Sequence, residues 1–219
     1  MTAKRGGAAS TPARGGYASR GALKLEAALD RFAIPVAGRR ALDAGASSGG
    51  FTDLLLVRGA REVVAVDVAY GQFDWRLRND HRVRLLERTN VRDLTVAQAG
   101  GPVGIVAADL SFISLRTVRV ALLGVCEQDT DLVLLVKPQF EAPREQVEHG
   151  GVVTNPTIWR DALARVAAAY RDVGCALLDA VASPLVGPKG NREFFLHLRR
   201  SESGDRSDDV LDSALAAAP

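Results

Sequence analysis

The chain has 219 residues, 47% hydrophobic and 25% charged, so it can bury one large core or two small ones. Its net charge of +2 creates no strong overall attraction to a polyanion, and no apolar run approaches the ~20 residues that span a bilayer. The cysteines Cys126 and Cys175 have no metal-binding spacing with the histidines. The N-terminus also lacks the apolar segment of a secretory signal. We therefore predict a cytoplasmic protein without a metal centre.

The charges are unevenly distributed along the chain. Residues 1–40 carry eight basic and two acidic side chains, whereas the C-terminal residues are acidic and small. We predict a flexible basic segment over residues 1–16, one domain over residues 17–200, and an acidic, alanine-rich tail over residues 201–219. The tail would either form one short helix or stay disordered. The basic start keeps nucleic acid open as a partner.

Helical and strand-like segments alternate between residues 19 and 200. The spacing of Ala22, Leu25 and Leu29 predicts a helix from Ser19. Further helices are predicted at about 49–58, 72–79, 114–124 and 156–173, with a loop over 140–153. Strands are predicted within 39–45, 62–68, 83–88, 103–110, 131–138, 175–184 and 192–200. The strands near 103–110 and 131–138 are apolar throughout, which is typical of burial on both faces. The alternation predicts an α/β fold with a parallel, doubly wound sheet.

A run of small residues, "LDAGASSGGFTDLL" at 42–55, links the first strand to its helix. Gly45 would permit a tight turn, and Gly49 and Gly50 would let a ligand approach the backbone before a helix that begins near Phe51. The G-x-G-x-x-G pattern of dinucleotide sites is absent, and no lysine marks a phosphate-binding P-loop. A ligand-binding turn is therefore favoured over a purely structural one, but not one for a dinucleotide.

Two acids narrow the choice of ligand. Asp67 ends the second strand, where a carboxylate can accept hydrogen bonds from a ribose. Asp43 precedes the glycine turn, and an acid there suits a cofactor with a positive amino-acid end and no phosphate. S-adenosylmethionine has these features. The predicted cofactor-binding residues are Asp43, Gly45, Ala46, Ser47, Gly49, Gly50, Phe51, Asp67, Val68, Asn90, Val91 and Asp109.

Asp109 and Lys137 end neighbouring predicted strands. Strand ends of a doubly wound sheet open into one crevice, so these side chains are expected to meet. The pair would be either a structural ion pair or part of a reactive site in which the lysine removes a proton.

Eight ordered motifs carry a resemblance to a known family: "SRGALKLEAAL", "LDAGASSGGFTDLLL", "VDVAYGQ", "ERTNVRDL", "AADLSFIS", "LVKPQFE", "GGVVTNP" and "GNREFFLHLR". They span about residues 17–199 and resemble the TlyA family, which is often labelled haemolysin. The resemblance implies an FtsJ-like, Rossmann-like methyltransferase fold with a mostly parallel seven-stranded sheet and an antiparallel last strand. It also implies S-adenosylmethionine-dependent 2′-O-methylation of ribosomal RNA.

The resemblance further implies a catalytic tetrad of Lys24, Asp109, Lys137 and Glu193. Lys137 would be the base that removes the proton of the 2′-hydroxyl. The two carboxylates would orient the lysines, and Lys24 would help to hold the hydroxyl. No metal is implied.

The family usually carries an N-terminal S4-type RNA-binding domain, which the 16 residues before Tyr17 are too few to form. Separately, we predict that Arg14, Arg20 and Lys24 contact RNA. Further candidates are Arg76, Arg78 and the loop that contains Arg144. For Phe112, packing in the core is favoured over stacking on a base.

Three other functions remain open. A methyltransferase could act on a protein or small molecule, although a Lys-Asp-Lys-Glu set suits a hydroxyl that must lose a proton. A membrane-active haemolysin or a non-catalytic RNA-binding module are the others. A lytic protein should have a long apolar segment or a strongly basic amphipathic helix. The sequence shows neither: the first predicted helix mixes Lys24 and Arg31 with Glu26 and Asp30.

Overall fold

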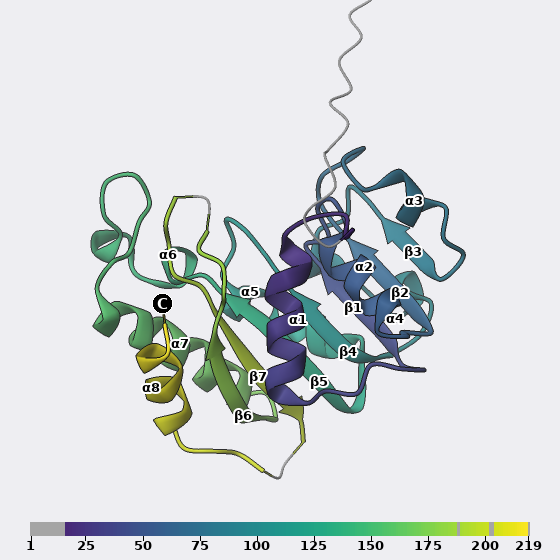
Figure 1. Ribbon diagram of the computed structural model, residues 1–219. Coiled ribbons are helices and arrows are strands. Elements are labelled where there is room, and N and C mark those ends of the chain that lie inside the picture. Colours follow the sequence, from purple (N-terminus) through teal and green to yellow (C-terminus); the bar gives the residue numbers. More distant parts are fainter. Residues whose placement is uncertain (1–15, 188, 202–203, 219) are drawn as a thin grey trace, which may run out of the picture.

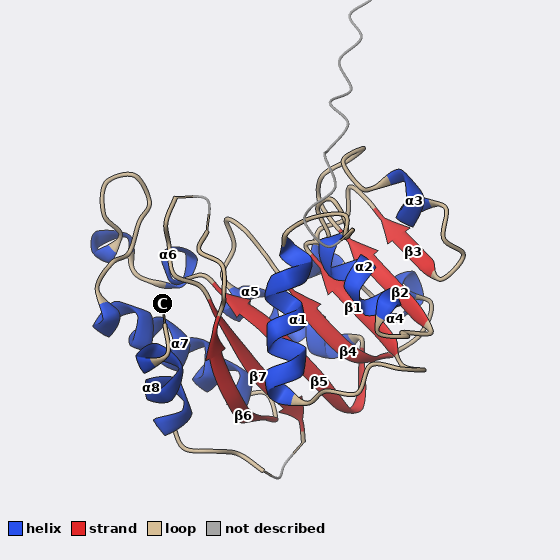
Figure 2. Cartoon of the chain, in the orientation of Figure 1, coloured by secondary structure: helices blue, strands red, loops and turns tan. Residues whose placement is uncertain are grey.

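The computed structural model describes residues 16–187, 189–201 and 204–218. Its strands form a seven-stranded sheet in the order β3-β2-β1-β4-β5-β7-β6 (Figures 1 and 2). The first five strands pair in parallel, and β7 runs antiparallel to both β5 and β6. The predicted fold class is thus confirmed, including the antiparallel last strand. The strands are β1 (Arg40–Ala44), β2 (Glu62–Val66), β3 (Val83–Leu86), β4 (Val103–Ala108), β5 (Cys126–Val136), β6 (Cys175–Ala182) and β7 (Phe194–Arg200).

Helices cover both faces of the sheet. The α-helices are α1 (Gly21–Phe32), α2 (Gly50–Val57), α3 (Trp75–Arg78), α4 (Val96–Ala99), α5 (Leu115–Gly124), α6 (Pro138–Glu141), α7 (Pro156–Arg171) and α8 (Asp209–Ala216), with 3-10 turns at η1 (Val91–Asp93) and η2 (Arg144–Gln146). Buried side chains of α1, α2 and α3 pack on one face, and those of α4, α5, α7 and α8 pack on the other.

Side chains alternate between these two cores along each central strand. In β5, Val133 and Leu135 belong to the α1 side, whereas Leu132 and Leu134 belong to the α5 side. All four are at most 1% exposed. A strand buried on both faces needs apolar residues at every position, which explains the uninterrupted apolar run in the sequence.

The longest helix, α7, begins where local chemistry favours it. The Asn155 side chain accepts a hydrogen bond from the backbone N–H of Thr157 at 2.9 Å, and Pro156 follows as the first residue of α7. Helix α1 begins at Gly21 rather than at the expected Ser19, and it ends at Ala33 in a left-handed conformation.

The C-terminal residues form a helix that packs against the domain, which is one of the two outcomes expected for the tail. Leu211 and Ala214 of α8 are buried. Arg171 of α7 forms ion pairs with Asp205 at 2.9 Å and with Asp208 at 2.8 Å. Acidic residues of the C-terminal segment therefore form ion pairs with a basic side chain of α7.

Some expected boundaries were wrong. The expected loop over 140–153 contains the end of α6, the turn η2 and a bridge between Glu148 and Val152. Helix α3 has four residues instead of eight, with Asp74 as its N-cap. Within the described residues, no helix is both long and apolar enough to cross a membrane.

Candidate active site

Two adjoining cavities lie at the carboxyl ends of the central strands. The first, about 300 Å³, is bounded by the start of α1, the glycine turn and the loop that contains Leu185 and Val186. The second, about 450 Å³, is bounded by the ends of β2 and β4 and by η1. Gly45, Ser47 and Asp109 line both cavities, so the two are neighbouring parts of one crevice.

The glycines of the turn are required by packing of the chain on itself. Gly45 has a φ of +89°, and a Cβ there would collide with the backbone oxygen of Asp109. At Gly49, which lines neither cavity, a Cβ would lie 2.5 Å from a methyl carbon of Leu77. A Cβ at Gly50 would collide with Ser19 Oγ. We expected Gly49 and Gly50 to leave room for a ligand, but they instead leave room for other protein atoms. Gly50 does line the first cavity.

Asp43 lies beneath the turn and lines neither cavity, which corrects the expectation that it faces the crevice. Its side chain is fully buried, and Oδ2 accepts hydrogen bonds from Thr52 N at 2.9 Å and Thr52 Oγ1 at 2.6 Å. Among the described residues, Oδ1 has no hydrogen-bond partner. Burial, reinforced by the charges of Asp109 and Asp67, raises the pKa of Asp43 to about 7.

The remaining ten residues predicted to bind the cofactor line the crevice. Asp67 accepts hydrogen bonds from Ser47 N at 2.7 Å and Ala69 N at 2.8 Å, which ties the end of β2 to the glycine turn. The first cavity contains Gly45, Ala46, Ser47, Gly50, Phe51 and Asp109. The second also contains Asp67, Val68, Asn90 and Val91. Carboxylates and an amide beside apolar walls fit a ligand with a ribose, an apolar ring system and a positive end.

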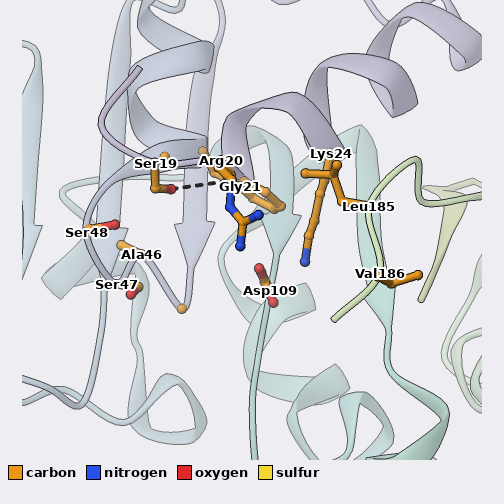
Figure 3. A pocket seen from close by; sticks show the side chains of 13 residues that line it. Ser19, Arg20, Gly21, Lys24, Ala46, Ser47, Ser48, Asp109, Leu185 and Val186 are labelled. Atoms are coloured by element: carbon orange, nitrogen blue, oxygen red, sulfur yellow. Dashed lines mark hydrogen bonds between the residues drawn. The ribbon is translucent and has the colours of Figure 1, made fainter. Parts of the chain in front are cut away.

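The structure brings the four predicted catalytic residues together as two ion pairs. Lys24 Nζ lies 2.6 Å from Glu193 Oε2, and Lys137 Nζ lies 2.6 Å from Asp109 Oδ1. Lys24 and Asp109 both line the first cavity, and Figure 3 shows the Lys24 side chain pointing from α1 toward Asp109. The Glu193 side chain is only 2% exposed. One member of each ion pair, Lys24 or Asp109, therefore lines the first cavity, beside the predicted cofactor site.

The segment around Ser19, at the start of α1, borders this cavity, and only its Arg20 was predicted as a site residue. Ala18 N donates to Asp53 Oδ2 at 2.8 Å, which fixes the segment to α2. Ser19, Arg20 and Gly21 then line the cavity (Figure 3). Sequence reasoning also missed Ser111, whose Oγ accepts a hydrogen bond from Lys137 Nζ at 3.0 Å.

The predicted RNA contacts fall into different environments. Arg14 lies outside the described residues. Arg20 is exposed at the cavity, whereas Arg76 and Arg78 are each paired at 2.6 Å with a carboxylate, Asp53 and Glu87 respectively. Arg144 is exposed.

Phe112 was predicted to pack in the core, and this prediction was wrong. It is 92% exposed, has a φ of +64° and lies 5.2 Å from the Phe140 ring between centroids. It also lines the second cavity. Among the described residues, no cluster of His, Cys, Asp or Glu has the arrangement of a metal site.

Comparisons with known proteins agree with this geometry. Residues 17–200 match the family described as FtsJ-like methyltransferase. A Mycobacterium tuberculosis protein, 16S/23S rRNA (cytidine-2′-O)-methyltransferase TlyA, is 53% identical over 93% of this chain and 77% of its own length. A solved Lactococcus lactis structure, provisionally described as a hemolysin, is 37% identical with a TM-score of 0.87 over 91% of this chain and 97% of that one.

A more distant structure bears on the fold alone. An S-adenosylmethionine-dependent methyltransferase from Mesorhizobium loti is 14% identical, with a TM-score of 0.58 over 80% of this chain and 96% of that one. The match to the family covers most of the chain, including both cavities and both ion pairs. The chain therefore belongs to the FtsJ-like methyltransferase family.

Proposed function

We propose that this protein methylates the 2′-hydroxyl of a ribose in ribosomal RNA, with S-adenosylmethionine as methyl donor. The observation that carries the proposal is the pairing of Lys137 with Asp109 and of Lys24 with Glu193, with Asp109 and Lys24 both lining the cavity beside the cofactor site. The 53% identity to a protein named as an rRNA cytidine-2′-O-methyltransferase supports the same substrate.

The second cavity and the glycine turn are the proposed cofactor site. Asp67 and Asn90 supply oxygens to a ribose and an adenine edge, and Val91 and Ile113 give the cavity apolar walls. When bound, S-adenosylmethionine supplies a methyl group activated by its sulfonium. Asp43 supports the turn from below through its hydrogen bonds to Thr52 rather than contacting the ligand.

We assign a different catalytic role to each ion pair. A ribose 2′-hydroxyl is a weak nucleophile until its proton is removed. Lys137 Nζ is the proposed acceptor of that proton, and Asp109 together with Ser111 fixes the position of Nζ. Lys24, held by Glu193, stabilises the negative charge that develops on the oxygen.

RNA is the proposed partner at the open side of the first cavity. Arg20 also lines this cavity, and Figure 3 shows its guanidinium pointing toward Asp109. We propose that this guanidinium contacts a phosphate of the bound RNA. A ribosomal substrate also implies that the protein acts in the cytoplasm.

The proposal is tested by incubating the protein with isotope-labelled S-adenosylmethionine and ribosomal subunits or protein-free rRNA. We expect label in the RNA, retained as a 2′-O-methylated nucleoside after complete digestion. Label in a protein or small molecule instead would favour a different acceptor. A lack of cofactor binding by calorimetry would exclude methyl transfer altogether.

Replacing Gly187 with alanine should disturb Glu193 specifically. A Cβ at Gly187 would lie 2.8 Å from Glu193 Oε1, so the carboxylate must move relative to Lys24. We expect kcat to fall about tenfold or more, because small displacements of catalytic groups have large effects. The melting temperature should change little. Gly124→Ala is the matched control, since a Cβ there meets nothing within 4 Å. Equal activity of the two variants would argue against the role of Glu193.

Replacing Phe112 with alanine should weaken RNA binding. An exposed aromatic ring at the rim of the crevice is suited to stack on a base that has left its helix. Loss of one such contact corresponds to about 1–3 kcal/mol, or roughly a 5- to 150-fold increase in Kd for RNA. Filter binding measures it, with Val120→Ala on α5 as the control, because Val120 is also an exposed apolar residue and lines neither of the two cavities. An unchanged Kd for Phe112→Ala would remove this residue from the RNA interface.

A further inference from the structure

The loop from Asp109 to Ser114 carries several groups of the crevice at once. Asp109 pairs with Lys137, Ser111 accepts a hydrogen bond from the same lysine, and Leu110, Phe112 and Ile113 line the second cavity. The position of this loop therefore affects both the proposed base and the cofactor site.

The loop is in a backbone conformation that it would not adopt unaided. Phe112 has a φ of +64°, in the left-handed region that is unfavourable for a bulky residue. Such conformations persist where the surrounding structure imposes them. The start of the loop is fixed by a hydrogen bond from Asp109 N to Ala44 O at 2.9 Å, so a second fixed point is needed at its other end.

Glu141 provides that second point. Its side chain is 1% exposed. Its Oε1 accepts from Leu115 N at 2.7 Å, and its Oε2 accepts from Ser114 Oγ at 2.5 Å and Arg116 Nε at 3.1 Å. Burial raises the pKa of this carboxyl group, and the hydrogen bonds from Ser114, Leu115 and Arg116, together with the charge of Arg116, offset part of that effect.

Glu141 also stands on the segment that begins with the proposed base. Helix α6 follows Lys137 directly, and Glu141 is its last residue. The ring of the adjacent Phe140 contacts Phe112. The segment 137–141 is therefore linked to the loop or to its C-terminal end at Lys137, at Phe140 and at Glu141, and Glu141 has the most buried of these three side chains.

We propose that Glu141 is a positioning residue, which holds the Asp109–Ser114 loop so that Asp109 meets Lys137 and the loop closes the cofactor cavity. Its effect on catalysis rests on the proposed function, but its effect on the loop does not. A purely structural role as a cap for α5 is the alternative, because Leu115 N is the first N–H of that helix. Helix α5 has other anchors, including a hydrogen bond from Tyr170 Oη to Leu115 O at 3.2 Å.

The test compares Glu141→Ala with Glu141→Gln in the full chain. The alanine variant loses all three side-chain hydrogen bonds. The glutamine variant can still accept from Leu115 N and donate to Ser114 Oγ. Glu145→Ala is the control, because Glu145 is an exposed carboxylate four residues away. Three quantities are measured: amide hydrogen exchange, Kd for S-adenosylmethionine by calorimetry, and kcat for rRNA methylation.

For Glu141→Ala we expect amide exchange to rise about tenfold within residues 109–114 and to stay unchanged in β1 and β2. We expect Kd for the cofactor to rise severalfold and kcat to fall about 10- to 100-fold. For the glutamine variant, the exchange rate, Kd and kcat should all lie close to those of the original protein. The control variant should match the original protein. If the alanine variant does not fold, Ser114→Ala takes its place, with the same local change in exchange expected.

Two results would overturn the inference. One is faster exchange throughout the protein, or only within α5, with an unchanged loop. The other is a mobile loop with unchanged cofactor affinity. If the original protein transfers no methyl group to rRNA, the proposed function fails, whereas exchange and cofactor affinity still decide the role of Glu141.

Discussion

Lys137→Ala is expected to lower the rate of methyl transfer to RNA by about 10²- to 10⁴-fold, the range that a general base contributes. The reason is its place in the site: Nζ is held by Asp109 at 2.6 Å and by Ser111 at 3.0 Å. Its side chain lines neither cavity wall, so S-adenosylmethionine should bind with nearly unchanged Kd. Single-turnover methylation and calorimetry measure the two quantities separately.

The matched control for this variant is Lys189→Ala. Lys189 is an exposed lysine that donates to Gly150 O at 2.8 Å, outside both cavities. Its replacement should leave the single-turnover rate within about twofold. A normal rate for Lys137→Ala would remove this lysine as the base. A lost rate together with lost cofactor binding would instead place Lys137 in the cofactor site.

Topology made the Asp109–Lys137 pair predictable from the sequence. Both residues directly follow apolar strands, and strands of a parallel sheet end at the same edge. Strands β4 and β5 are neighbours, and their register places Asp109 level with Leu135, two residues before Lys137, so both side chains come to the same edge of the sheet. No knowledge of side-chain packing was needed.

The Lys24–Glu193 pair could not be found in this way. The two residues are 169 positions apart, and one is on a helix while the other precedes an antiparallel strand. Each looked like an ordinary surface charge. Only the resemblance to a family identified them, because local periodicity contains no information on which helix crosses which strand.

The glycine and acid patterns singled out residues that mostly line the crevice, but the physical reasons given for Gly49, Gly50 and Asp43 were wrong. Gly49 and Gly50 face protein atoms, since α3 and the segment before α1 close on the turn. Phe112 was assigned to the core because large apolar residues are usually buried. That rule fails where a loop is held by other groups, here Glu141 and Phe140, and such exceptions concentrate at functional sites.

The buried carboxyl group of Asp43 should make the stability of the protein depend on pH. Its pKa rises from 3.8 in the unfolded chain to about 7 in the folded protein, chiefly because of burial. Between these values the folded state keeps a proton that the unfolded state has released. The free energy of unfolding should therefore fall as pH rises from about 4 to about 7 and then level off, at about 1.4 kcal/mol per pH unit from this group.

Asp43→Asn should remove that contribution, because an amide stays neutral at every pH while its oxygen can still accept from Thr52 N. We expect the free energy of unfolding of the variant, relative to the original protein, to increase by about 3 kcal/mol between pH 5 and pH 8. Urea denaturation at a series of pH values measures this difference. Asp172→Asn, at an exposed position after α7, is the control and should follow the original curve. Parallel curves for Asp43→Asn and the original protein would show that Asp43 is ionised in the folded state throughout this range. The glycine turn would then rest on a buried charge rather than on a neutral acid.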